Sequence, residues 1–145
     1  MITLLFEANK MHIDKVSATI IAGTDEGLKP FGFEYDFEPG LNILTGDNSS
    51  GKSTILSCMY YCLGMEQLMG SKGINALSPA LHQALNYDGY SHNIYESSCS
   101  LTFTANNDKE YKLTRRITSS DETTINEILI FDGTITTPKF VHSAR

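Results

Sequence analysis

The feature that most constrains this chain is a glycine-bounded polar loop set between an apolar run and a stretch with helical periodicity. Residues 46–53 read GDNSSGKS and match the eight-residue pattern GxxxxGK[ST]. The apolar run before the loop, Leu41–Thr45, predicts a short strand buried on both faces. After the loop, apolar residues recur at helical spacing and predict a helix over Ser50–Gly64, which Gly64 ends. The sequence therefore predicts a strand, a phosphate loop and a helix in direct succession.

The residue types in this loop fit the binding of a nucleoside triphosphate. Gly46 and Gly51 allow the main chain to curl so that successive N–H groups point inward at a phosphate. The first turn of the following helix adds free N–H groups and the positive end of its dipole. In this pattern Lys52 reaches the β- and γ-phosphates as the catalytic cation, and the Ser53 hydroxyl is placed to bind Mg²⁺. Thr54 is a candidate donor to the α-phosphate. The predicted site is Gly46, Asp47, Asn48, Ser49, Ser50, Gly51, Lys52, Ser53 and Thr54, with ATP and Mg²⁺ as its cofactors.

The rest of the chain is mainly of β pattern, so the sequence predicts an α/β protein. Strands are expected over residues 12–22, 31–37, 99–105 and 111–117, with turns at 23–27 and 106–108. A further strand over 128–131 is followed by Asp132-Gly133, a hairpin signal leading into 134–137. A short helix over 79–85 and a Tyr-rich polar loop after it are less regular. We divide the chain into a core (12–64), an irregular or helical insertion (65–97) and antiparallel strands (98–138).

Composition limits the class of protein and its partners. The chain has 145 residues, of which 41% are hydrophobic, so it can form one domain with a core. A net charge of −6 argues against a protein coated in positive potential for nucleic acid. No apolar run approaches the roughly 20 residues that span a bilayer, and we expect no signal peptide and no membrane. Cys58, Cys62 and Cys99 are expected to be buried apolar residues in a reducing cytoplasm rather than metal ligands.

Four phrases of the sequence resemble one family of ATPases. Residues 31–56, FGFEYDFEPGLNILTGDNSSGKSTIL, resemble the amino-terminal head segment of the SMC/RecN/RecF group of ABC-type ATPases, as does the helix end YCLG at 61–64. CSLTFTANNDKEYKLTRRI (99–117) and ILIFDGTITT (128–137) are similar to that family's strand pair and the hairpin that follows. The resemblance covers about residues 13–138. Ser49 is a departure, since many relatives have glycine there.

The resemblance implies a P-loop NTPase fold: an ABC/SMC-type head lobe with a mixed sheet wrapped around the loop helix, and an antiparallel β subdomain. It also implies that parts are missing. No LSGGQ-like signature, no apolar strand ending in Asp-Glu and no switch histidine can be found in the sequence. Gln67 and Gln83 lie too early to be the family's Mg²⁺-contacting glutamine. The chain is therefore expected to be the front half of a head. A carboxy-terminal half or a second head would complete it, and the isolated chain would not hydrolyse ATP.

Several residues outside the loop have two interpretations each. Lys109, Lys112, Arg115 and Arg116 form a basic cluster, which either contacts DNA phosphates, as surfaces near these strands do in SMC-type heads, or is a solvated strand face. Arg115 and Arg116 should point to opposite faces. Phe31 and Phe33 either lie near the adenine, by analogy with relatives, or pack in the core. The histidines, His12, His82, His92 and His142, are expected on the surface or in loops.

Two other classes of protein remain open on the sequence. One is a nucleotide-binding segment of an ABC transport ATPase. The wide gap after the first helix, the Thr-Arg-Arg strand and the missing signature argue against it. The other is a small P-loop kinase, which would need an arginine-rich lid and a mononucleotide pocket. Neither can be located in the sequence. The downstream sequence would discriminate, because heptads favour the SMC-like interpretation and a nearby signature favours transport.

Overall fold

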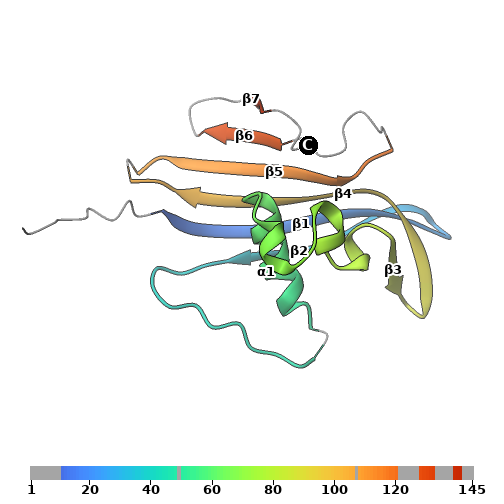
Figure 1. Cartoon of the computed structure of the whole chain (residues 1–145). Coiled ribbons are helices and arrows are strands. Elements are labelled where there is room, and N and C mark those ends of the chain that lie inside the picture. The colour runs from blue at the N-terminus through green and yellow to red at the C-terminus, as the bar shows by residue number, and fades with distance from the viewer. Residues whose placement is uncertain (1–10, 49, 107, 121–127, 133–138, 142–145) are drawn as a thin grey trace, which may run out of the picture.

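A long antiparallel sheet carries one α-helix and three short 3-10 helices on a single face (Figure 1). The computed structural model describes residues 11–48, 50–106, 108–120, 128–132 and 139–141. The order of strands in the sheet is β2-β1-β4-β5-β6-β7, with β3 paired to β4. The strands are β1 (His12–Thr24), β2 (Gly27–Asp36), β3 (Ala84–Tyr87), β4 (Tyr90–Thr104), β5 (Glu110–Thr118), β6 (Ile128–Asp132) and β7 (Lys139–Val141). The helices are α1 (Lys52–Cys62), η1 (Glu66–Met69), η2 (Gly73–Ala76) and η3 (Pro79–Leu81).

The alternation of side chains decides which face of the sheet is covered. In β1, Val16, Ala18, Ile20 and Ala22 are buried, and the residues between them point to the other face. The register continues this pattern, since Ala18 pairs with both Phe33 of β2 and Cys99 of β4. Helix α1 packs on the apolar face through Cys58, Tyr61 and Cys62, and Leu77 and Leu81 complete the core. The predicted alternation over 31–37 and 99–105 is thereby confirmed.

The opposite face of the sheet is lined with hydroxyl groups. Ser98, Ser100, Thr114 and Arg116 lie on neighbouring strands there, and the Ser100 and Thr114 hydroxyls are 2.8 Å apart. These small polar side chains suit a face that no helix covers. Among the described residues, no helix is long and apolar enough to cross a membrane.

Two hairpin turns have the chemistry that tight turns require. Asp88 and Gly89, between β3 and β4, both have positive φ (51° and 79°), as the two-residue hairpin turn demands. Asp108, in the turn from β4 to β5, also has positive φ (54°). The predicted turn at 106–108 is confirmed for the residues described, which exclude residue 107, and its flanking rings Phe103 and Tyr111 stack at 5.4 Å. The predicted strand over 134–137 lies outside the described residues.

Helix α1 ends at Cys62, and Gly64 terminates it, as predicted. Gly64 adopts φ 69°, and its N–H donates to the carbonyl of Tyr61. The next N–H, of Met65, donates to the carbonyl of Tyr60 at 2.8 Å. This pair of bonds is the Schellman arrangement, which satisfies the last carbonyls of a helix and favours glycine at the left-handed position.

Two predicted elements differ from the structure. Leu41–Thr45 does not form a strand, and every pairing between described strands is antiparallel, so the predicted mixed sheet is wrong for this part of the chain. The physical reason is that a strand requires a partner. Residues 41–45 leave the edge strand β2 and pair with no described strand (Figure 1). The second difference lies within 65–97, where the predicted helix over 79–85 is only the short η3 and the Tyr-rich loop belongs to the β3–β4 hairpin.

Candidate phosphate-binding site

Two glycines with positive φ shape the loop that precedes α1. Gly46 has φ 152° and Gly51, the residue before the first helical residue, has φ 87°. A Cβ on Gly46 would lie 2.8 Å from the Ser50 hydroxyl, so that side chain would have to move, and the backbone at this φ is strained for any residue with a side chain. The Ser50 N–H donates to the carbonyl of Asp47 at 3.2 Å and closes the turn. The loop therefore depends on glycine for both its curvature and its internal space.

The Lys52 side chain folds back into this loop. Its Nζ donates to the carbonyl oxygens of Gly46 and Asp47, both at 2.6 Å, and lies 3.3 Å from the Ser50 hydroxyl. An ammonium group has three donors, so these three contacts account for all of them. The loop thus places a full positive charge inside its own curve, at the start of a helix whose first turn contains no acidic residue.

The first turn of α1 presents further groups for an anion. The Ile55 N–H is the first to bond within the helix, donating to the Gly51 carbonyl at 3.0 Å. Ser53 is exposed and Thr54 is half-buried. Asp47 and Asn48 are exposed on the loop, whereas Ser49 lies outside the described residues. The structure therefore brings the described members of the predicted site together at one helix end, with main-chain N–H groups and hydroxyls of the kind that bind phosphate oxygens.

An apolar groove of about 300 Å³ lies beside the first turn of α1. Thr54 forms part of its wall, and Phe31 and Phe33 of β2 and Tyr87 of β3 supply aromatic side chains. The Phe31 and Tyr87 ring centroids are 5.1 Å apart. Phe31 and Phe33 also pack against the core cluster, so both interpretations of these phenylalanines are compatible with their position. Tyr87 and its neighbour Asn86 were missed in the sequence, because nothing there brings β3 next to the phosphate loop.

The predicted basic cluster is divided between the two faces of the sheet. Arg115 is buried at 2% exposure, whereas Arg116 lines a shallow groove on the hydroxyl face with Thr19 and Ser98. The expectation that these arginines point to opposite faces is confirmed, and Arg115 does not belong to any surface patch. Lys112 is exposed, and the Lys109 ammonium lies 5.8 Å from the centroid of the Tyr111 ring.

Arg115 instead forms a buried ion pair that the sequence did not reveal. Its guanidinium donates to both carboxylate oxygens of Glu66 at 3.1 Å. Burial acts to raise the pKa of Glu66, but the hydrogen bonds and charge of Arg115, together with hydrogen bonds from main-chain N–H groups, outweigh it, and the pKa lies below its ordinary value. The Nε of Arg115 has no partner among the described residues. This pair fixes η1 and the end of α1 to β5, and no periodic signal could reveal it because the partners are far apart in the chain.

The remaining candidates have structural surroundings. The three cysteines are buried and free, with the Cys62 and Cys99 sulfurs 3.4 Å apart, as expected of small core residues. Neighbouring thiols and burial raise the pKa of Cys99. No group of three His, Cys, Asp or Glu side chains in the described part of the chain could hold a metal ion. Gln67 lies in η1 and Gln83 between η3 and β3, and both are exposed.

The histidines have partners within the fold. The His12 Nδ1 lies 2.7 Å from a carboxylate oxygen of Asp14, and His82 contacts the carbonyl of Leu77. His92 contacts two main-chain carbonyls in the hairpin region. His142 lies outside the described residues. None of the described three contacts the phosphate loop, as expected for residues on the surface or in loops.

Comparison with known proteins agrees with the geometry of the loop. A family model described as an AAA domain matches residues 26–139, more than half of the chain. The match spans β2, the phosphate loop, α1 and the strands that follow. A search of curated proteins found no match. On this match, the chain belongs to the AAA domain family of nucleotide-binding ATPases.

Proposed function

We propose that this chain is the ATP-binding amino-terminal half of an SMC/RecN-like ATPase head. The loop around Lys52 supports this, because it sets one cation at the start of a helix whose first turn contains no acidic residue to act as a general base. A carboxy-terminal half or a second head supplies the signature motif and the acidic residues for hydrolysis. The complete head acts on DNA in repair, chromosome organisation or anti-phage defence, as the resemblance of 31–56 and 99–117 implies.

The single observation that carries the half-head assignment is the exposure of the segment before the loop. Leu41 is 88% exposed and Ile43 is 70% exposed, although both are apolar. No main-chain hydrogen bond joins residues 41–45 to another described main-chain group. Within this segment, the side-chain amide of Asn42 forms hydrogen bonds with the main chain of Glu38 and Gly40. An extended apolar segment with free N–H and C=O groups supports completion by strands from another polypeptide segment.

Different groups of the site suit the phosphates, the magnesium ion and the base of the nucleotide. The N–H groups at the start of α1 and the Lys52 ammonium suit the phosphates, and the exposed Ser53 hydroxyl suits a magnesium ion bound with them. Mg²⁺ would neutralise charge on the phosphate oxygens when it is bound. The groove between Thr54 and the aromatic side chains of β2 and β3 suits the base and ribose, since bases stack on aromatic rings.

A nucleotide-binding measurement tests the proposal. We expect the chain to bind a fluorescent ATP analogue with Mg²⁺ saturably, and Lys52→Ala to reduce the affinity at least about tenfold, since charge-assisted bonds to phosphate are lost. Lys72→Ala is the control, because Lys72 is an exposed lysine that precedes η2 rather than lying at the start of α1. Phosphate release should stay at the background level for all three proteins. Turnover by the isolated chain that Lys52→Ala abolishes would contradict the half-head assignment.

A further inference from the structure

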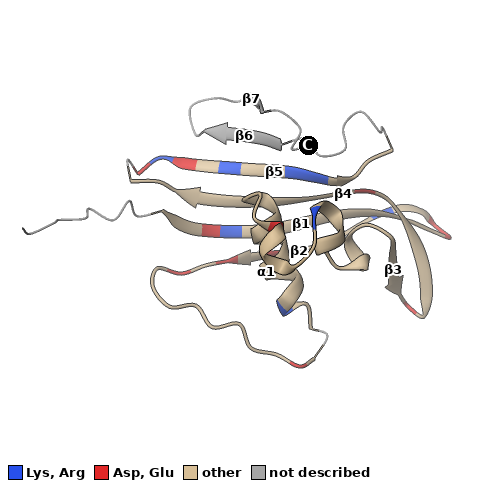
Figure 2. Cartoon of the chain, in the orientation of Figure 1, with Lys and Arg blue, Asp and Glu red and all other residues tan. Residues whose placement is uncertain are grey.

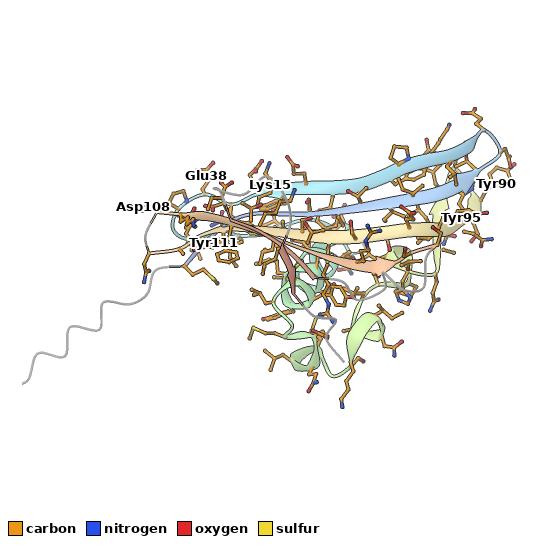
Figure 3. The ribbon with its side chains drawn as sticks, turned by 90° about the horizontal axis from the view of Figure 1, so that it is seen from above. Lys15, Glu38, Tyr90, Tyr95, Asp108 and Tyr111 are labelled. Carbon is orange, nitrogen blue, oxygen red and sulfur yellow. The ribbon has the colours of Figure 1, made fainter. Side chains whose placement is uncertain are left out.

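Two hairpin turns meet at the end of the sheet marked by Tyr90 and Tyr95 in Figure 3, opposite Asp108 and Tyr111. One turn joins β1 to β2, and the other joins β3 to β4. His92 connects them, because its Nδ1 lies 3.0 Å from the Gly23 carbonyl and its Nε2 lies 3.3 Å from the Tyr87 carbonyl. We call residues 24–29 and 87–92 the tip surface. Its two halves come from distant parts of the sequence but form one continuous surface.

The tip surface exposes large apolar and aromatic side chains of a kind that usually lies buried in a protein. Leu28 is 64% exposed, Tyr87 is 53% exposed and Tyr90 is 67% exposed. Tyr87 is held in place by Phe31, 5.1 Å away between ring centroids, so its ring is ordered before any partner arrives. Tyrosine is enriched where proteins bind one another, because a rigid ring provides contact area at a low entropic cost. The tip surface therefore has the composition of a docking surface.

Its charge selects the partner. Three carboxylates, of Asp25, Glu26 and Asp88, line a hollow of about 130 Å³ between the two turns. Lys29 is the one lysine in that lining, and it is paired with Glu26. Figure 2 shows acidic residues at both turns. The surface is therefore acidic, which disfavours nucleic acid, and the hollow is smaller than the several hundred Å³ of a typical ligand pocket. It has the size for the end of one side chain.

We propose that the tip surface binds a lysine- or arginine-bearing segment of a partner protein. The cationic end of one side chain enters the hollow between Tyr87, Tyr90 and Asp88. Carboxylates attract the cation and accept its hydrogen bonds, and the exposed tyrosine faces add cation–π attraction. The surface lies apart from the phosphate loop, but Tyr87 also lines the groove proposed for the base, so the binding is tested without nucleotide.

A peptide titration tests the proposal on the full chain labelled with ¹⁵N. The probe is an acetylated, amidated Gly-Arg-Gly-Lys-Gly peptide, and the control probe replaces its cationic residues with Glu and Asp. We expect saturable amide shifts confined to residues 24–29 and 87–92, weaker at high salt, with the cationic peptide alone. Lys52→Ala should respond like the parent protein, which separates this result from the fate of the nucleotide proposal.

A matched pair of substitutions sharpens the test. Asp88 and Asp108 both have positive φ in hairpin turns, at opposite ends of the sheet, and asparagine tolerates this conformation. Asp88→Asn should weaken peptide binding by about fivefold, the range of an exposed ion pair, whereas Asp108→Asn should leave it unchanged. Three results would overturn the proposal: no saturable shift at the tip, equal weakening by both substitutions, or tip shifts that grow with protein concentration alone. The last would assign the surface to a second copy of the chain.

Discussion

The guanidinium of Arg115 lies 3.8 Å from the centroid of the Tyr61 ring, and its NH1 donates to the main-chain carbonyl of Tyr61 at 2.8 Å. The Tyr61 hydroxyl in turn donates to the carbonyl of Arg116 at 2.9 Å. Helix α1 and strand β5 are therefore bonded to each other in both directions. Because α1 begins at the phosphate loop, this contact fixes the helix that positions Lys52 against the sheet.

Removing the buried cation should destabilise the fold strongly. Arg115→Met leaves the Glu66 carboxylate buried without its cationic partner, and a broken buried ion pair reduces the free energy of unfolding by about 3 kcal/mol or more. Urea unfolding followed by circular dichroism measures this change. Arg116→Met is the control, since Arg116 lies on the uncovered face of the sheet and its substitution should change the free energy of unfolding far less. Equal losses for both variants would contradict the role given to the ion pair.

The same pair should make stability depend on pH in one direction. The pKa of Glu66 lies below its ordinary value of 4.5 in the folded chain, so the unfolded state binds the proton first as pH falls. The stability contributed by ionised Glu66 is therefore fully present above that ordinary value and is lost as pH falls through the folded pKa. Parent and Glu66→Gln proteins compared by urea unfolding at neutral pH and at acid pH should differ most at neutral pH. A difference that grows on acidification would contradict this sign.

Gly46 should be required for binding rather than for folding. Gly46→Ala places a methyl group 2.8 Å from the Ser50 hydroxyl at φ 152°, so the Ser50 side chain must move and the loop backbone is strained. We expect nucleotide affinity to fall by about tenfold or more, which is roughly 1.4 kcal/mol, while the unfolding midpoint changes little because the loop is exposed. Gly40→Ala is the matched control, because Gly40 also has positive φ but a Cβ there would meet nothing within 4 Å. It should leave the affinity unchanged.

The exposed apolar segment should govern association rather than stability. Replacing Leu41 and Ile43 with Gln should leave thermal unfolding almost unchanged, because exposed substitutions alter stability by about 0.5 kcal/mol or less. Light scattering at rising concentration should show less self-association than in the parent chain, since exposed apolar patches promote it. Leu101→Gln, at a fully buried position, serves as the contrast and should unfold the protein. Loss of fold in the double variant would show that the segment packs within this chain.

Local chemistry made the glycine-bounded loop, the end of α1 and the turn between β4 and β5 predictable. The GxxxxGKS pattern, the helix end at Gly64 and the alternation over 31–37 each follow from interactions between residues close in sequence, and the structure agrees with them. Asp88-Gly89 is the same kind of signal as Asp132-Gly133, and it could have revealed the β3–β4 hairpin within the segment predicted to be irregular. That error came from a tyrosine-rich composition, which suggested a loop.

Long-range partners explain what the sequence did not predict. Arg115 was expected on a surface because charged residues are rarely buried, and its burial depends on Glu66, 49 residues away. The strand predicted over Leu41–Thr45 does not form, although its composition is typical of a strand, because no described strand lies beside it. Local pattern specifies the tendency to form a strand, and the neighbour decides whether one forms.

The inward fold of Lys52 has a consequence for how affinity is measured. The ammonium is already satisfied by the carbonyls of Gly46 and Asp47, so a phosphate that engages Lys52 replaces existing bonds rather than adding new ones. The contribution of Lys52 to the observed affinity is then the difference between its bonds to phosphate and its bonds to the loop carbonyls. A modest affinity is therefore compatible with a well-formed phosphate site. Replacing Lys52 by Ala removes the lysine–carbonyl bonds of the free loop together with the lysine–phosphate contact of the bound state. The measured loss of affinity therefore understates the strength of the lysine–phosphate contact itself.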